Sequence, residues 1–409
     1  MKALVFMTDP EPVPPPPAGA PRLVQHLATT PMKIEEVPDP VLLGDDWLVL
    51  RTRLAGICGS DTKQVLMDFD DAGDNPMTAF ISFPQVLGHE VVADVVEVGP
   101  AVRDIAVGQR VVLNPWLSCA PRGIDPPCPA CAAGDYSACW SFLDGRLAPG
   151  IHSGNSRDAT GGFAEYLPAH RLMVVPVPDG IPDEVAVLAD PFAVSLHAIC
   201  RNPPPDGGRA VVYGAGALGT TATAILRALH PSVEVATVAR WPAQAALAAR
   251  LGATVFDPEP RHELIEALAG WSGVPVRRPW EGLPVLYPGH IDCIYDTVGA
   301  PETVEVGIRV LAHGGKLVQM GVSSPARFEW TPWYFKELQL VGSNAFGVEE
   351  LEGRRQHAIA HYLNLVEAGR IDLSGMLTHR FRLDQWRDAF RTLIDQGSTG
   401  AIKVAFDFR

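Results

Sequence analysis

The sequence has little positive charge and no long apolar run. Its 409 residues include 33 Lys and Arg against 47 Asp and Glu, which gives a formal net charge of −14. A chain this acidic is repelled by phosphate backbones and anionic lipids, so a role on nucleic acid or at a membrane surface is disfavoured. The best imitation of a membrane span, 210–226, contains three glycines and falls short of about 20 apolar residues. These absences favour chemistry on small molecules.

A secretory signal is also missing, because the initial MKALVF is not a basic region followed by a long apolar stretch. We therefore expect a cytoplasmic protein, in which a disulfide framework is the less expected use of the seven cysteines. Single hydrophobic cores stop growing at roughly 250 to 300 residues, so a chain of this length predicts two domains.

The pattern of predicted secondary structure changes near Ala210. Earlier residues form short β-type runs separated by Gly and Pro, which predict a barrel or sandwich. Later residues alternate strand, helix and strand, which predicts a parallel, doubly wound α/β sheet. The chain after about Gly342 is expected to return to the first domain, so the predicted division is 1–190 with 343–409 against 191–342. Three segments have the composition of insertions or loops: 11–21, 68–76 and 271–289.

Four cysteines fall close together in the segment SCAPRGIDPPCPACAAGDYSAC. Four thiolates suit tetrahedral Zn²⁺, and the C-x2-C step lets two sulfurs reach one ion from a tight turn. A loop of reduced thiols without metal is the alternative, and a DNA-binding module is disfavoured because no basic segment adjoins it. The predicted structural zinc lobe, near 119–139, uses Cys119, Cys128, Cys131 and Cys139.

Five motifs occur in a particular order along the chain. They are GICGSD at 56–61, GHE at 88–90, GGFAEY at 161–166, LADPFAVSLHA at 188–198 and GAGALG at 214–219. A lone Cys or His is more often a buried structural residue than a ligand, but this set resembles the zinc-containing medium-chain dehydrogenases over nearly the whole chain. The similarity is to their alcohol, polyol and threonine dehydrogenase branch. It implies a GroES-like β-barrel catalytic domain followed by a Rossmann domain.

The resemblance also implies roles for single residues. Cys58 and His89 match ligands of a catalytic zinc, and Glu90 matches an acid that ligates the metal or stands behind it. Ser60 matches the hydroxyl of a proton relay, and Asp61 matches an acid that orients the ligand histidine. A carboxylate on the far nitrogen of a ligand histidine fixes its tautomer and raises its basicity, although Asp61 could instead cap a helix or turn.

Two positions depart from the family pattern. Asp190 stands where polyol-type members carry Glu and others Cys, so it is expected either to bind zinc, directly or through water, or to cap the turn before Pro191. Glu90 replaces it if Asp190 does not reach the metal. Lys63 stands where relatives carry the histidine that ends the relay. It could bind a cofactor phosphate or ribose, or be a solvated surface lysine.

GAGALG follows the strand-like RAVVY and opens a helical segment, which is the context that a dinucleotide-binding loop requires. Gly214 permits the turn, Gly216 lets the backbone approach a pyrophosphate, and Gly219 allows helix and strand to pack closely. Leu218 belongs to the same expected contact set. A glycine-rich turn without a ligand is the alternative.

The residues at the end of the next predicted strand indicate which nicotinamide cofactor the protein prefers. NAD-preferring sites carry an acid there for the adenosine ribose, but family spacing puts Ala239 at that position, followed by Arg240. Loss of the carboxylate and a nearby guanidinium favour NADP over NAD.

The predicted function is hydride transfer between an alcohol, or its carbonyl product, and a nicotinamide, with zinc acting as Lewis acid and Ser60 passing on the proton. A zinc-free quinone or enoyl reductase of the same superfamily and a non-catalytic nucleotide-binding protein are the rival functions. We expect a homodimer or homotetramer. Acids of the 68–76 segment could form a lid, with a solvated loop as the alternative: Asp68, Asp70, Asp71 and Asp74. Four aromatic residues are candidates either for the substrate wall or for plain core packing: Trp116, Trp140, Phe163 and Trp333.

Overall fold

The computed structural model describes residues 1–10, 13–14, 19, 21–67, 76–322 and 327–409. These residues form two compact units. The first comprises Met1–Asp190, Ile359–Glu367 and Leu377–Arg409, and the second comprises Pro191–Ala358 and Ala368–Met376. The first division falls within the opening turn of α5 (Ala189–Arg201).

Residues 343–358 and 368–376, which we expected in the first domain, group with the second unit. They include the antiparallel hairpin β17–β18 (Val348–Leu351 and Arg354–His357). Its buried Glu349 holds it to α5, since Oε1 lies 2.5 Å from His197 Nδ1 and Oε2 accepts a hydrogen bond of 3.1 Å from Arg201 Nε. This buried pairing explains why residues 343–358 stay with the second unit.

The first unit is built around β3 (Trp47–Gly56), which lies in the middle of a seven-stranded sheet. The order is β19-β20-β3-β5-β6-β8, and β7 also pairs with β3. The other strands are β5 (Glu90–Val98), β6 (Arg110–Leu113), β7 (Tyr166–His170), β8 (Val174–Pro176), β19 (Leu377–Phe381) and β20 (Lys403–Asp407). Apolar side chains from β3, β5, β6, β7 and β8 form one core cluster that includes Trp47, which is fully buried.

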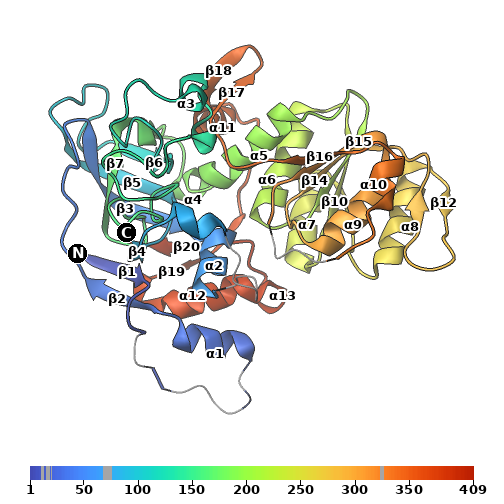
Figure 1. Cartoon of the computed structure of the whole chain (residues 1–409), viewed down its shortest axis with the longest axis horizontal. Coiled ribbons are helices and arrows are strands. Elements are labelled where there is room, and N and C mark those ends of the chain that lie inside the picture. The colour runs from blue at the N-terminus through green and yellow to red at the C-terminus, as the bar shows by residue number, and fades with distance from the viewer. Residues whose placement is uncertain (11–12, 15–18, 20, 68–75, 323–326) are drawn as a thin grey trace. The chain divides into compact units, whose positions relative to one another are not determined.

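A second core in this unit lies beneath a three-stranded sheet of order β2-β1-β4: β1 (Lys2–Phe6), β2 (Met32–Glu36) and β4 (Gln85–Val86). Phe163, Phe390 and Phe406 meet edge to face within it. Helix α12 (Trp386–Ile394) lies against β20 and β19, as Figure 1 shows. The remaining helices of the unit are α1 (Arg22–Thr29), α2 (Gly59–Val65), α3 (Pro129–Ala133), α4 (Asp183–Ala186), α11 (Ala358–Glu367, from Ile359 on) and α13 (Gln396–Thr399); its 3-10 turns are Pro76–Phe80, Tyr136–Ala138, Arg171–Met173 and Leu383–Gln385.

The second unit contains a parallel six-stranded sheet. Its order is β11-β10-β9-β14-β15-β16, so the first strand in the chain lies inside the sheet and the order reverses beside it, as in dinucleotide-binding folds. The strands are β9 (Arg209–Tyr213), β10 (Glu234–Val238), β11 (Thr254–Phe256), β14 (Ile291–Asp296), β15 (Leu311–Gln319) and β16 (Gln339–Gly342). Helices flank the sheet in Figure 1: α6 (Ala217–Leu229), α7 (Pro242–Arg250), α8 (Arg261–Ser272), α9 (Pro301–Val310) and α10 (Thr331–Phe335). The predicted fold class is thereby confirmed.

Of the three predicted insertions, 271–289 is fully described. It contains the short hairpin β12–β13 (Val276–Arg277 and Val285–Leu286), with Trp280 fully exposed at its turn. The acids Asp68, Asp70, Asp71 and Asp74 lie outside the described residues, as does most of 11–21.

Candidate active site and metal centres

The antiparallel pairing of β3 with β5 brings the first cluster together. Gly56 at the end of β3 is paired with Glu90 at the start of β5. Cys58 follows β3 and precedes α2, and His89 immediately precedes β5. Ligand atoms of Cys58, His89 and Glu90 all lie within 4.8 Å of one another. A thiol, an imidazole and a carboxylate at this spacing are a donor set that suits zinc.

Asp61 organises the cluster from the first turn of α2. Its Oδ2 accepts a hydrogen bond of 2.8 Å from the backbone N–H of Cys58, and its Oδ1 lies 3.7 Å from Nδ1 of His89. Burial disfavours a charge on His89, but Asp61 and Cys58 outweigh it and raise the pKa of His89 well above its usual value. Surroundings that favour a buried cation fit a bound metal ion.

Glu90 has a buried partner that the sequence did not reveal. The ammonium of Lys403, in β20, forms an ion pair with Oε2 of Glu90, and both side chains are 2 % exposed. The same ammonium donates a hydrogen bond of 2.9 Å to the carbonyl of Ile57. The charge of Glu90 is therefore balanced within the protein.

Asp190 differs from Glu90 in this respect. It is buried at the start of α5, and among the described residues no Lys or Arg forms an ion pair with it. Burial raises the pKa of Asp190 to about 7, although His89 nearby acts in the opposite direction. Its oxygens do not join the group of ligand atoms within 4.8 Å. Lys403 also attracts the charge of Asp190, but of these two carboxylates Asp190 is the one without a directly paired Lys or Arg among the described residues.

The four-cysteine cluster is assembled as its spacing predicted. Ligand sulfurs of all four residues lie within 4.8 Å of one another, and the sulfurs of Cys119 and Cys139 are 3.6 Å apart. Backbone N–H groups point at them: those of Cys131 and Trp140 donate to Cys128 Sγ at 3.5 Å. Burial opposes ionisation, but these donors lower the pKa of Cys128 to about 6. N–H groups directed at clustered thiolates fit a structural zinc.

Arg122 holds this lobe together from within. The side chain is completely buried, and within the described part of the chain its guanidinium donates only to backbone carbonyls. The acceptors are Leu117, Asp144, Leu147, Ala148 and Gly150, at 2.7 to 3.2 Å. The segments before and after the four cysteines are thereby fixed to each other.

A second histidine lies beside the ligand cluster, and sequence reasoning missed it. The ring of His152 packs on that of His89 with centroids 4.5 Å apart, and on Trp116 edge to face at 6.1 Å. Its Nδ1 lies 2.7 Å from the carbonyl oxygen of Ser153. Burial and the neighbouring His89 lower the pKa of His152 to about 3. The only signal in the sequence was its position between the cysteine lobe and GGFAEY.

The other residues predicted for the site differ in how exposed their side chains are. Ser60 is exposed and Lys63 half-buried, both on α2. Of the candidate wall residues, Trp116 is buried beside His152, Trp140 is 70 % exposed, and Phe163 is fully buried in the core. Trp333 lies in the second unit, where it packs against the sheet core and donates a hydrogen bond to Leu338.

The predicted cofactor loop lies between β9 and α6. Gly214 has φ +96°, a conformation that L side chains rarely adopt, and a Cβ on Gly219 would lie 1.9 Å from the carbonyl oxygen of Gly214. By contrast, a Cβ on Gly216, just before α6, would meet no atom within 4 Å. Leu218 is in the first turn of α6. The open approach to a helix N-terminus suits a pyrophosphate.

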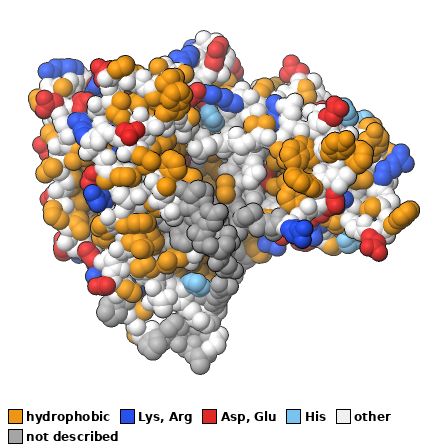
Figure 2. All heavy atoms as spheres, viewed as in Figure 1, with side chains coloured by type: hydrophobic (Ala, Val, Ile, Leu, Met, Phe, Trp, Pro, Cys, Tyr) orange, Lys and Arg blue, Asp and Glu red, His pale blue; other side chains and the backbone are white. Residues whose placement is uncertain are grey.

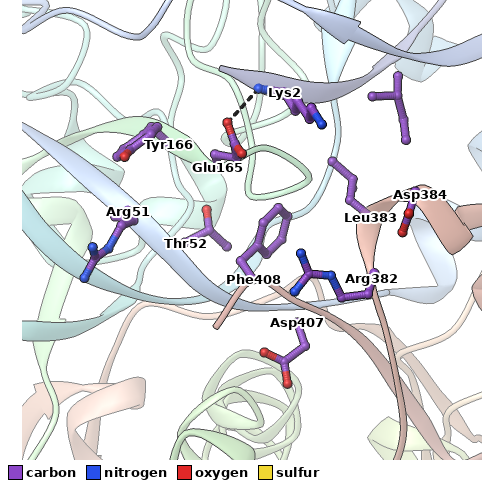
Figure 3. A pocket seen from close by; sticks show the side chains of 11 residues that line it. Lys2, Arg51, Thr52, Glu165, Tyr166, Arg382, Leu383, Asp384, Asp407 and Phe408 are labelled. Atoms are coloured by element: carbon purple, nitrogen blue, oxygen red, sulfur yellow. Dashed lines mark hydrogen bonds between the residues drawn. The ribbon is translucent and has the colours of Figure 1, made fainter.

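Figure 3 shows a separate cavity of about 420 Å³ in the first unit. Lys2, Arg51 and Arg382 line it together with Glu165 and Asp407, so charges of both signs are mixed around it. No residue predicted for the active site belongs to its lining. The mixture indicates no particular class of ligand.

Known protein families match segments in both units of the structure. Residues 44–179 match the alcohol dehydrogenase GroES-like domain, and residues 217–360 match the zinc-binding dehydrogenase family. L-galactonate-5-dehydrogenase of Escherichia coli is 28% identical over 85% of this chain and 87% of its own length. (R,R)-butanediol dehydrogenase of Saccharomyces cerevisiae is also 28% identical, over 88% of this chain and 91% of its own.

Among solved structures, a protein from Sinorhizobium meliloti described as a zinc-binding dehydrogenase, bound to NADP, is 25% identical with a TM-score of 0.73. The match covers 99% of this chain and 98% of that one. The β-domain with its zinc-type donor sets and the Rossmann sheet thus define a nicotinamide-linked, zinc-dependent oxidoreductase. More narrowly, the chain belongs to the zinc-containing medium-chain alcohol and polyol dehydrogenase family. No helix in the described part of the chain has the length and apolar character needed to cross a membrane.

Proposed function

We propose that this dehydrogenase oxidises a secondary alcohol bearing a further polar group, and reduces the corresponding carbonyl, with NADP as its preferred nicotinamide. The observation that carries the proposal is the cluster of half-buried Cys58 with buried His89 and Glu90, beside Asp190, in a chain that also has a dinucleotide loop. Relatives named for galactonate, butanediol and threonine support a substrate with several functional groups.

Cys58, His89 and Asp190 would hold the catalytic zinc. The distances favour Glu90 as the third ligand, but Glu90 forms a direct ion pair with Lys403, whereas Lys403 acts on Asp190 without pairing with it. Because a buried carboxylate requires a partner, we assign Asp190 as the third ligand, directly or through water, and Glu90 to the position behind the metal. Cys119, Cys128, Cys131 and Cys139 would hold the structural zinc.

When bound, the catalytic zinc supplies Lewis acidity to the substrate oxygen and the nicotinamide accepts the hydride. The chain's own residues do the rest. Asp61 orients His89 through Nδ1, and the exposed hydroxyl of Ser60 takes the proton outward, with water continuing the relay where Lys63 replaces a histidine. Gly214, Gly216 and Gly219, with Leu218, receive the cofactor pyrophosphate at the start of α6.

The NADP preference rests on Ala239 and Arg240 at the end of β10. Ala239 is buried and offers no carboxylate, while Arg240 is exposed with its guanidinium 5.5 Å from the ring centroid of Trp241. An exposed guanidinium at this strand end suits a 2′-phosphate. The NADP-bound structural relative supports the same preference.

We also propose a homodimer or homotetramer in the cytoplasm. Large hydrophobic side chains are exposed around α10, beside the edge strand β16: Trp330, Tyr334, Phe335 and Leu340. Figure 2 shows hydrophobic side chains gathered on this part of the second unit. Large exposed apolar patches are typical of subunit interfaces.

The function is tested with purified zinc-loaded protein, a panel of alcohols, and NADP and NAD separately, following the absorbance of the reduced nicotinamide. Removal of a metal ligand by Cys58→Ala should abolish alcohol oxidation. Ser60→Ala should slow it about 100-fold, the usual scale for loss of a proton-transfer group. Cys200→Ala, a half-buried cysteine outside both clusters, is the control.

Unchanged alcohol oxidation in Cys58→Ala, or after chelation, would favour a zinc-free reductase. Nucleotide binding without turnover of any alcohol would favour a non-catalytic protein.

A further inference from the structure

His152 is rigidly fixed beside the ligand cluster. The backbone N–H of Leu117 donates to the carbonyl of Ile151 at 3.0 Å, and that of Ser153 donates to the carbonyl of Pro115 at 2.8 Å, so Trp116 and His152 face each other across an isolated bridge. The Arg122 guanidinium fixes the same two segments through the carbonyls of Leu117 and Gly150. The position of His152 is therefore set by the four-cysteine lobe.

The hydrogen bond of His152 defines the chemistry of its ring. A carbonyl oxygen can only accept, so Nδ1 carries the hydrogen that is shared with Ser153. In the neutral ring, Nε2 then holds a lone pair. None of the described residues donates a hydrogen bond to Nε2, and the side chain is partly exposed. The free nitrogen is therefore available to accept a hydrogen bond from a group that is not part of the described chain.

The two neighbours of His152 indicate what that group is. On one side is His89, whose Nδ1 faces Asp61, so that its Nε2 is the nitrogen left for the metal. On the other side the indole of Trp116 offers an apolar wall, extended by Phe142 at 6.3 Å. An acceptor next to a metal ligand and an apolar wall suits a substrate with a donor on the carbon adjacent to the reacting carbinol.

We infer that His152 is a specificity-determining residue whose Nε2 accepts a hydrogen bond from a hydroxyl vicinal to the reacting one, which selects vicinal diols and polyols over simple secondary alcohols. The inference rests on the proposed function, because it requires alcohol oxidation at the Cys58 and His89 cluster. It adds to the proposed function a residue that selects the substrate and a physical reason for the class of substrate selected.

Butane-2,3-diol and butan-2-ol test the inference, because they share a carbon skeleton and differ by one hydroxyl. Wild-type protein should have a kcat/KM at least about 10-fold higher for the diol, since a site built to pair a hydroxyl discriminates against its absence. His152→Phe keeps a ring but removes the acceptor. It should lower kcat/KM for the diol about 10- to 100-fold, mainly through KM, and change that for butan-2-ol less than about 2-fold.

Three controls separate specificity from packing. His152→Gln, which retains an acceptor, should recover part of the preference for the diol. His262→Phe, at an exposed histidine of α8, should leave kcat/KM unchanged for both substrates. Zinc content and nicotinamide binding should be unchanged in His152→Phe, while calorimetric binding of the diol to the zinc-loaded protein should weaken with its KM.

Equal losses for both substrates, or a wild type that does not distinguish them, would overturn the inference and leave His152 a packing residue. A wild type that oxidises neither these nor any other alcohol would instead overturn the proposed function, and this inference with it.

Discussion

The ammonium of Lys403 forms a buried ion pair with the carboxylate of Glu90, next to the two residues that match the catalytic zinc ligands. Lys403 is in β20 and Glu90 begins β5, and both strands pair with β3. Removing one member of a buried pair leaves the other charge without compensation, which costs about 3–5 kcal/mol.

We therefore expect Lys403→Met to destabilise the first unit by at least about this amount, because it also removes the hydrogen bond to the Ile57 carbonyl, with Lys403→Arg as the charge-preserving control. Adding Glu90→Gln to Lys403→Met should recover at least half of the loss, because the uncompensated charge disappears. Urea denaturation of the zinc-loaded variants measures the difference. If the double variant is no more stable than Lys403→Met alone, the ion pair does not account for the effect.

The same pair leads to a prediction about the third zinc ligand. Asp190→Asn should weaken catalytic zinc binding about 100-fold or more, whereas Glu90→Gln should weaken it about 10-fold, since residues behind a ligand contribute less. Competition with a chelator, followed by metal analysis, gives both values. The zinc of the four-cysteine cluster serves as an internal reference. If Glu90→Gln weakened zinc binding more than Asp190→Asn does, Glu90 would be the third ligand.

The four-cysteine cluster predicts a separate loss. Cys131→Ser should remove one of the two zinc ions expected per chain and lower the unfolding temperature, because structural zinc contributes directly to folding. Activity should fall as well, since the lobe fixes Trp116 and His152 beside His89. Cys200→Ser is the matched control outside the cluster. Full retention of both metal ions in Cys131→Ser would contradict a four-thiolate site.

The sequence was sufficient wherever ligands or glycines lie close together in the chain. The spacing of Cys119 to Cys139 and the GAGALG loop are local patterns, so their geometry follows from a turn or a strand-to-helix junction. Lys403 and His152 reach the site only through pairing. Lys403 contacts Ile57 across 346 positions of sequence, and His152 depends on a bridge to Trp116. Such contacts depend on strand register and on one buried arginine, neither of which has a local signature.

The second unit contains a buried lysine with a structural role. The ammonium of Lys336 donates to the carbonyls of Ile308, Arg309 and Leu311, at the end of α9, where helical carbonyls lack partners within the helix. Burial, assisted by Arg309, lowers the pKa of Lys336 from 10.5 to about 7. Lys336→Met should therefore reduce stability by about 2 kcal/mol or more, because it leaves these buried carbonyls unpaired.

The lowered pKa also predicts how this difference changes with pH. Between pH 7 and 10.5 the unfolded chain holds more protons on Lys336 than the folded chain does, so raising the pH through this window favours folding of the wild type. Lys336→Met lacks this contribution. The stability gap between the two proteins should therefore widen from neutral to alkaline pH in denaturation measured at each pH. A gap that stays constant or narrows over this window would show that the lysine remains charged in the folded state.

Arg240 provides the most direct test of cofactor choice. Arg240→Asp replaces the exposed guanidinium at the end of β10 with a carboxylate, which repels a 2′-phosphate and can pair with ribose hydroxyls. We expect kcat/KM with NADP to fall about 100-fold relative to NAD, the scale of a lost charge-assisted contact combined with new repulsion. Arg278→Asp, at an exposed arginine of the 271–289 segment, makes the same charge change away from the loop and should leave the ratio unaltered. Because the comparison is a ratio of cofactors at fixed alcohol, it does not depend on the identity of the substrate. An unchanged ratio in Arg240→Asp would mean that groups other than Arg240 decide between the two nicotinamides.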